Sequence, residues 1–136
     1  MRFKITPIAV ALAALATVIP AAAHHSFEMF DMSKAMTITG TIKDFQWTNP
    51  HTFTFVDVAN DKGGVDTWAI EGMSPNFLGR RGWTKHTLSP GDKVTIQIAP
   101  LKDGQKGGTF LRATLADGKE MVMFDTPPRP QPTQAK

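Results

Sequence analysis

The chain has 136 residues, of which 41% are apolar and 20% are charged, and it contains no cysteine and no tyrosine. This length and balance are typical of one globular domain and exclude a chain that is disordered throughout. The absence of cysteine excludes a disulfide scaffold, a thiolate metal centre and a cysteine nucleophile.

The first 23 residues have the layout of a secretory signal peptide. Arg2 and Lys4 precede an apolar run, and this run ends in three small residues, Ala21 to Ala23. A basic leader, a short apolar segment and a small-residue cleavage site define such signals. The alternative of a membrane anchor is disfavoured, because the apolar run is shorter than the about 20 residues that a membrane helix needs. We therefore expect export to the periplasm and cleavage after Ala23.

Most of the positive charge belongs to this leader. The formal net charge of +3 falls to +1 once Arg2 and Lys4 are removed. The remaining charges alternate in sign, whereas a nucleic-acid-binding protein concentrates its basic residues on one surface. We therefore expect no nucleic-acid partner and, after cleavage, no stable membrane span.

An N-terminal arm of mixed character, residues 24–35, precedes three predicted strands. Residues 36–47 are rich in β-branched side chains, and Gly40 among them indicates a bulge or a sharp bend. A break at 48–50 leads to a second strand at 51–59. The turn 60–64 then leads to a third strand at 65–71.

A short helix follows the third strand, and two or three further strands complete the domain. Ser74 and Pro75 open the helix, because serine is a good N-cap and proline suits the first helical position. Residues 93–99 alternate between apolar and polar side chains, and a hairpin turn at 117–118 joins strands at 109–116 and 120–124. The tail 126–136 is rich in proline and polar residues, so we expect it to be disordered beyond a single domain at 24–125.

Three strands, a short helix and then further strands are the element order of the OB-fold, a small Greek-key β-barrel. We therefore predict an all-β domain with one short helix and an OB-like barrel, with an open β-sandwich as the alternative. Large apolar side chains of the strands are expected to form its core: Ile38, Ile42, Phe53, Phe55, Trp68, Ile70, Val94, Ile96, Ile98, Phe110 and Leu115.

The hairpin of the second and third strands predicts a polar cluster at one end of the barrel. Opposing residue numbers in this antiparallel pair sum to about 124, which puts His51 beside Glu71. Trp47 and Asn49 lie in the turn before His51, and Ser74 begins the helix just after Glu71. Polar groups at a barrel mouth are a usual ligand site. Turn chemistry and a cross-strand pair explain the same residues without a ligand.

The mature N-terminus is the second candidate site. Cleavage before His24 would free its α-amine, and the amine and the ring of one residue can chelate a metal ion. His25 and His51 add imidazole nitrogens, which suit copper, nickel or zinc. Alternatively, the adjacent histidines only form a soluble start to the chain. Three methionines follow in this region: Met29, Met32 and Met36. Their thioethers suit Cu(I) as ligands, or they simply fill apolar space.

Several short motifs, taken in order, resemble a family of small exported bacterial proteins of unknown function. They are HHSF at 24–27, TITGT at 37–41, WTNPH at 47–51, SPN at 74–76, RRGW at 80–83 and LSPGD at 88–92. The resemblance implies an exported, compact β-domain and brings no activity with it. It also favours the HHS start and the WTNPH segment as the functional regions.

The sequence therefore predicts a periplasmic binding module. It has no G-x-S-x-G elbow, P-loop or dinucleotide fingerprint, so we expect no enzymatic activity. The leading ligand is a transition metal, copper first, held by His24, His25 and His51. The predicted ligand-binding cluster is Trp47, Asn49, His51, Glu71 and Trp83. The alternative is an interaction domain without a metal, whose exposed tryptophans, Trp47, Trp68 and Trp83, contact an envelope protein or a small organic ligand.

Overall fold

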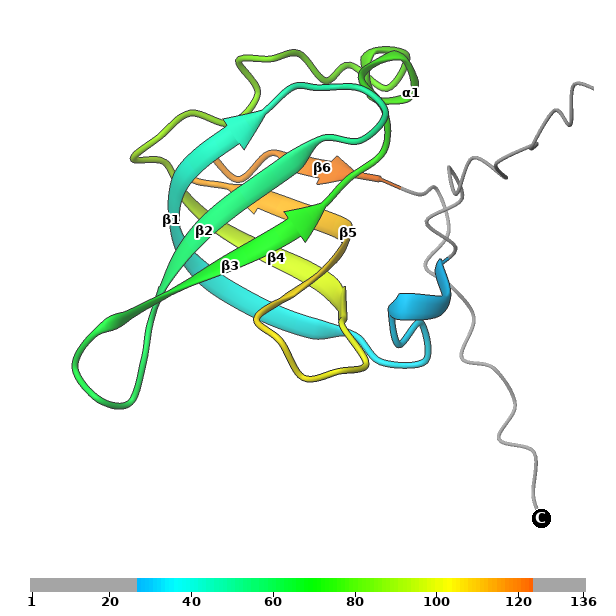
Figure 1. The fold of residues 1–136 in the computed structure, drawn as a ribbon. Coiled ribbons are helices and arrows are strands. Elements are labelled where there is room, and N and C mark those ends of the chain that lie inside the picture. The colour runs from blue at the N-terminus through cyan, green and yellow to red at the C-terminus, as the bar shows by residue number, and fades with distance from the viewer. Residues whose placement is uncertain (1–26, 124–136) are drawn as a thin grey trace, which may run out of the picture.

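The computed structural model describes residues 27–123, in which a short N-terminal arm precedes three antiparallel strands (Figure 1). They are β1 (Met36–Gln46), β2 (Phe53–Ala59) and β3 (Val65–Glu71). The short helix α1 (Pro75–Gly79) follows β3, as predicted. The expected signal peptide 1–23, His24, His25 and the tail 126–136 lie outside the described residues.

Three further strands complete the sheet and close it into a barrel. They are β4 (Lys93–Pro100), β5 (Gly107–Leu115) and β6 (Glu120–Val122), in the sheet order β3-β2-β1-β4-β5-β6. β3 also pairs with β5 in parallel, which joins the two ends of the five-stranded part. This closed barrel, with a helix between β3 and β4, is the predicted OB-like fold. The alternative of an open β-sandwich is wrong.

The start of α1 follows the chemistry that its sequence predicts. The Ser74 side chain accepts a hydrogen bond from the backbone N–H of Phe77 at 3.3 Å, and Pro75 occupies the first turn. The chain leaves the helix through Gly82, whose φ of 82° favours glycine. The next residue, Trp83, donates its backbone N–H to the Leu78 carbonyl at 3.1 Å. The helix therefore ends in a tight turn that sends Trp83 into the barrel.

A β-bulge in β1 keeps both halves of this long strand facing the core. Ile42 pairs with Val56 of β2, and Phe45 pairs with Thr54, with the register shift between Ile42 and Asp44. Alternation alone would put Ile42 and Phe45 on opposite faces, and one extra residue brings them to the same face. The bulge thus lies after Gly40, at which a bulge or a bend was predicted.

The buried face of β2 is the reverse of the one predicted. Thr52 and Thr54 are 2% and 3% exposed, whereas Phe53 and Phe55 are half-buried outside the main core cluster. The two phenyl rings lie side by side, with centroids 6.4 Å apart and an interplanar angle of 26°. The expectation that Phe53 and Phe55 belong to the core is therefore wrong.

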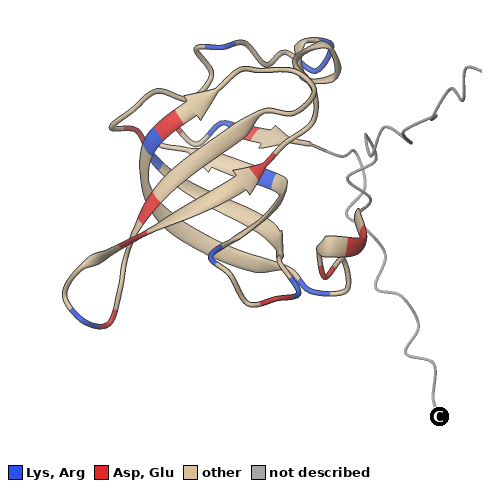
Figure 2. Ribbon diagram, viewed as in Figure 1, with Lys and Arg blue, Asp and Glu red and all other residues tan. Residues whose placement is uncertain are grey.

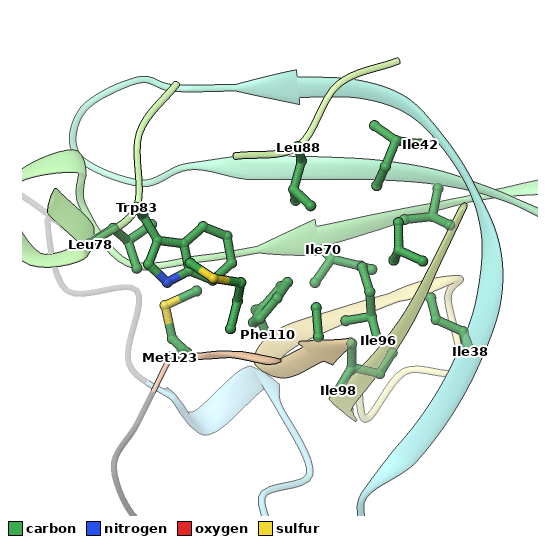
Figure 3. Close-up of a cluster of buried hydrophobic side chains, with 14 residues drawn as sticks. Ile38, Ile42, Ile70, Leu78, Trp83, Leu88, Ile96, Ile98, Phe110 and Met123 are labelled. Carbon is green, nitrogen blue, oxygen red and sulfur yellow. The ribbon is translucent and has the colours of Figure 1, made fainter. Parts of the chain in front are cut away.

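The core inside the barrel contains side chains from the strands, the helix and the loop after it (Figure 3). Trp83 is 2% exposed, and its ring packs edge-on against Phe110 with centroids 5.2 Å apart. Trp68 and Leu115 are half-buried and pack against this cluster, and the other core residues predicted from β1, β3, β4 and β5 are buried. Ten buried apolar residues were not predicted: Phe30, Val56, Leu78, Trp83, Leu88, Ala99, Leu111, Ala113, Met121 and Met123.

Candidate functional site

The register of the β2–β3 hairpin confirms the predicted contact between His51 and Glu71. Phe53 pairs with Glu71, so the residue numbers of opposing positions sum to 124. The pairing continues beyond the strands, because Gly72 N–H donates to the Thr52 carbonyl at 2.8 Å. Thr52 in turn donates both its N–H, at 3.3 Å, and its hydroxyl, at 3.0 Å, to the carbonyl of Met73. The segment around His51 is therefore held firmly against the chain that follows β3.

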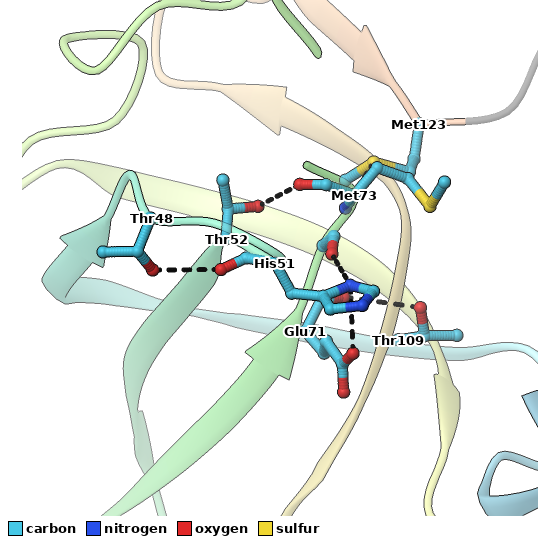
Figure 4. A network of polar contacts seen from close by, with 8 residues as sticks. Thr48, His51, Thr52, Glu71, Met73, Thr109 and Met123 are labelled. Carbon is cyan, nitrogen blue, oxygen red and sulfur yellow. Dashed lines mark hydrogen bonds and ion pairs between the residues drawn. The ribbon is translucent and has the colours of Figure 1, made fainter. Parts of the chain in front are cut away.

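The His51 ring is oriented by two acceptors at the same nitrogen (Figure 4). Its Nδ1 lies 3.0 Å from the carbonyl oxygen of Gly72 and 3.2 Å from Oε1 of Glu71. The His51 side chain is 27% exposed, and that of Glu71 is 13% exposed. Because both neighbours are acceptors, Nδ1 carries the proton, and the lone pair of the neutral ring is on Nε2. This is the tautomer in which a histidine binds a metal through Nε2.

His51 and Glu71 line a small cavity of about 80 Å³ between β3, β5 and the N-terminal arm. The hydroxyl of Thr109, on β5, donates to the backbone carbonyl of Glu71 at 3.4 Å and lines the same space. The other lining residues are Phe27, Phe30, Gly72 and Met73. The cavity therefore combines an imidazole, a carboxylate and a thioether within an apolar wall.

The described part of the N-terminal arm is fixed to the outside of the barrel. The arm includes the single turn η1 (Phe27–Met29), and Phe30 is 5% exposed in a cluster with Ala99 and Leu111. Backbone hydrogen bonds hold it on both sides of Phe30. The carbonyl of Met29 accepts from Lys102 at 3.0 Å, and the Asp31 N–H donates to Pro100 at 2.8 Å. Phe27 is thus kept at the rim of the His51 cavity.

A charged turn after Phe30 supports this attachment. The Ser33 hydroxyl donates to the Asp31 carboxylate, and Lys34 lies 3.0 Å from its other oxygen. The hydrogen bond from Ser33, followed by that from Lys34, holds the pKa of Asp31 below its ordinary value. The carboxylate is therefore charged at neutral pH, the state in which it accepts these hydrogen bonds.

The predicted ligand-binding residues do not all meet at this cavity. Of the five, the structure brings together only His51 and Glu71 within the described residues. Trp47 is half-buried against the core, edge-on to Phe45 at 5.8 Å. Asn49 is exposed in the turn, which is held by a bond from the Thr48 hydroxyl to the His51 carbonyl at 3.0 Å.

The expectation of an exposed Trp83 is wrong. Its ring lies inside the barrel because the turn after α1 directs it there, and its Nε1 is buried without a hydrogen-bond partner among the described residues. Trp68 is also packed against the core. The three tryptophans therefore do not form the exposed contact surface that the alternative interpretation requires, and the outward-facing rings of β2 are Phe53 and Phe55.

A larger and more open hollow of about 260 Å³ lies elsewhere, between the loop before β4 and the end of β5. Its charged residues are engaged by neighbours: the Asp92 carboxylate accepts the Ser89 N–H at 2.8 Å, and Lys93 donates to the Thr41 hydroxyl. It contains neither an imidazole nor a thioether among its lining residues. We therefore place the candidate site at His51, in spite of the smaller volume there.

Within residues 27–123, no surface stands out by an excess of one sign of charge. Figure 2 shows that basic and acidic segments are interspersed over the ribbon.

Within residues 27–123, no three histidine or carboxylate side chains are grouped as a metal site would require. No helix in the same range is long and apolar enough to cross a membrane. A metal site at His51 would therefore need donors from outside the described residues or of another type.

Comparisons with known proteins give a family and one distant structural likeness. A family model described as "Family of unknown function (DUF6152)" matches residues 11–114. A search of curated proteins finds no match. Among solved structures, the mitochondrial single-stranded DNA binding protein Rim1 from S. cerevisiae is 14% identical, with a TM-score of 0.45. The alignment covers 61% of this chain and 94% of that chain.

Proposed function

Because this chain belongs to a family of unknown function, we propose its role from the site itself: an exported, non-enzymatic module that binds a transition metal, copper first. The metal ligands are His51 and the amino-terminal histidines, His24 and His25. One observation carries the proposal: Phe27, at the start of the described arm, lines the same cavity as His51.

The length of the chain brings the amino-terminal histidines within reach of His51. His24 precedes Phe27 by three residues, which can extend roughly 10 Å at about 3.3–3.6 Å per residue. The arm that follows Phe27 is attached to β4 and β5, so this short reach starts from a fixed point. Both His24 and His25 can therefore contact a metal ion at the cavity without rearrangement of the barrel.

The donor set suits copper. An α-amine with a pKa of about 8 and an imidazole with a pKa of about 6.5 both lose their protons readily near neutral pH. Cleavage after Ala23 would give His24 both groups, which form a chelate, and His51 Nε2 would add a further nitrogen. Nitrogen donors favour Cu(II) over the other divalent metals of the first row. The lack of a catalytic motif is the reason for proposing binding and not turnover.

The processed protein, beginning at His24, tests this proposal by titration with Cu(II), using calorimetry and electron paramagnetic resonance. We expect one Cu(II) ion per chain in a nitrogen-rich environment. A variant with one glycine added before His24 keeps every side chain but moves the amine, and we expect it to bind Cu(II) much more weakly. The proposal is refuted if the parent protein does not bind Cu(II). It is also refuted if both the glycine variant and His24→Ala bind Cu(II) as tightly as the parent protein does.

Glu71 is expected to act on the metal through His51. A carboxylate at the far nitrogen of a ligating histidine fixes the ring and raises its basicity, and its loss typically lowers metal affinity about 10–100-fold. We predict that Glu71→Gln weakens Cu(II) binding by about tenfold, because the amide keeps an acceptor but loses the charge. Glu120→Gln, on the exposed start of β6, is the matched control. An unchanged affinity in Glu71→Gln would show that this carboxylate does not orient a ligand.

A further inference from the structure

The outer face of β2 carries two phenyl rings that the candidate metal site does not use. Thr52 and Thr54 point into the barrel, so Phe53 and Phe55 point outward from the same strand. Their ring centroids are 6.4 Å apart, and their ring planes are inclined by only 26°. Both residues are half-buried, and Figure 1 shows that neither α1 nor η1 lies over the middle of β2. The two rings therefore form a narrow aromatic strip along an outer face of the barrel.

Polar groups of β1 lie along one side of this strip. Gln46 pairs with Phe53, and Asp44 pairs with Phe55. Paired residues of an antiparallel sheet point to the same face, so both polar side chains lie beside the rings. The amide Nε2 of Gln46 donates to Oδ2 of Asp44 at 3.1 Å, and both residues are exposed. This edge of the strip therefore presents an amide and a carboxylate next to each other.

The other side of the strip, on β3, is open at one ring. Ala69 pairs with Phe55 and is exposed, and its methyl group is too small to cover a phenyl ring. Glu71 pairs with Phe53 and also lines the His51 cavity. Phe55 is therefore the ring with more space beside it and the one farther from the candidate metal site.

The one cation of this face is engaged by its neighbours. Lys43 is the only lysine or arginine in β1, β2 and β3. Its Nζ lies 3.2 Å from the Thr67 hydroxyl and 3.9 Å from Oδ1 of Asp57. Nucleic acids are bound mainly through cationic side chains that neutralise their phosphates. The strip therefore suits a neutral ligand better than a phosphate backbone.

We propose that this face of β2 binds a neutral, β-1,4-linked oligosaccharide. The C–H groups on one side of a pyranose ring are attracted to the electron-rich face of a phenyl ring. Sugar hydroxyls both donate and accept hydrogen bonds, which matches the Gln46 amide and the Asp44 carboxylate. In OB-folds this face binds chain-like ligands, either oligonucleotides or oligosaccharides. Two rings in line suit a chain whose successive units present flat faces, and the engaged Lys43 favours the sugar.

The test titrates the processed protein with cellohexaose and with the N-acetylglucosamine hexamer, followed by nuclear magnetic resonance. We expect the parent protein to bind at least one of them. Phe55→Leu keeps an apolar side chain but loses the flat ring, so its affinity should fall roughly threefold to tenfold. Phe77→Leu, at a half-buried ring of α1, is the matched control and should bind as the parent protein does. Cu(II) binding should be the same in all three proteins.

Magnetisation transfer between sugar protons and the rings of Phe53 and Phe55 tests the same contact in the parent protein. It keeps the inference testable if Phe55→Leu does not fold. The inference is wrong if neither hexasaccharide binds, if no transfer to these rings is seen, or if a folded Phe55→Leu binds as the parent protein does. A thymidine oligonucleotide that binds more tightly than either sugar would assign the face to single-stranded nucleic acid instead.

Discussion

Replacing His51 with alanine is expected to lower the Cu(II) affinity of the processed protein by more than about 100-fold, because loss of an outer-shell partner alone already lowers metal affinity about 10–100-fold. His51 is the one imidazole that lines the cavity within the described residues. Its Nδ1 lies close to the Gly72 carbonyl and to Glu71, so a neutral His51 with its proton on Nδ1 would bind a metal through Nε2.

The control for this substitution is His86→Ala. His86 is exposed in the loop after α1, and it does not line the cavity. Calorimetric titration with Cu(II) measures both variants, and thermal unfolding monitored by circular dichroism checks that each one is folded. His51→Ala removes the partner of the Gly72 carbonyl and of Glu71, so its unfolding midpoint should fall, but the protein should stay folded because His51 lies outside the core. Equal losses of affinity in both variants, or none in His51→Ala, would contradict the assignment.

Gly40→Ala is expected to destabilise the barrel by about 2–3 kcal/mol, the upper part of the usual range for overpacking a well-packed region. A Cβ at Gly40 would overlap the carbonyl oxygen of Asp57 and lie 2.8 Å from Cγ1 of Val56. Both atoms belong to β2, at the place where β1 passes from its pairing with β4 to its pairing with β2. Neither the carbonyl nor the buried valine can move away without breaking the sheet.

Gly79→Ala provides the matched control for the glycine prediction. Gly79 ends α1, and a Cβ there meets no atom within 4 Å. Alanine is favoured over glycine in a helix by up to about 1 kcal/mol, so this variant should be as stable as the parent protein or slightly more stable. Urea unfolding measures both changes in the free energy of unfolding. A Gly40→Ala protein as stable as Gly79→Ala would show that β1 and β2 can separate at this point without loss.

The strands and their order could be predicted from local patterns, and so could the contact between His51 and Glu71. β-branched runs, the turn at 60–64 and the cap at Ser74 are all encoded by neighbouring residues. The hairpin register follows from the turn position alone, and it brings His51 to Glu71 without further information. Local sequence patterns were therefore sufficient to predict that His51 and Glu71 lie together in the cavity.

The other half of the cavity depends on contacts between distant segments. Thr109 reaches Glu71 because β5 pairs in parallel with β3, and Phe27 and Phe30 reach it because the arm packs on β4 and β5. No local pattern in the sequence specifies these contacts. Met73, by contrast, follows Glu71 by two residues, and its thioether could have been noticed in the sequence.

Hydrophobicity alone gave the wrong face for β2. Phe53 and Phe55 are the more apolar residues, yet the smaller Thr52 and Thr54 face the interior. Ile70 pairs opposite Thr54, and large side chains such as Trp83 and Phe110 occupy the interior of the barrel. The volume inside a closed barrel is limited, so the smaller threonines face the interior and the larger phenylalanines face outward.

The most direct measurement is the number of imidazole rings bound to Cu(II) in the processed protein and in His51→Ala, obtained by pulsed electron paramagnetic resonance. The account predicts that the parent protein binds copper through His51 and at least one amino-terminal imidazole, and that the variant loses one imidazole signal. Identical signals in the two proteins would mean that the copper ion does not contact the barrel, and would contradict a site shared by the amino terminus and His51.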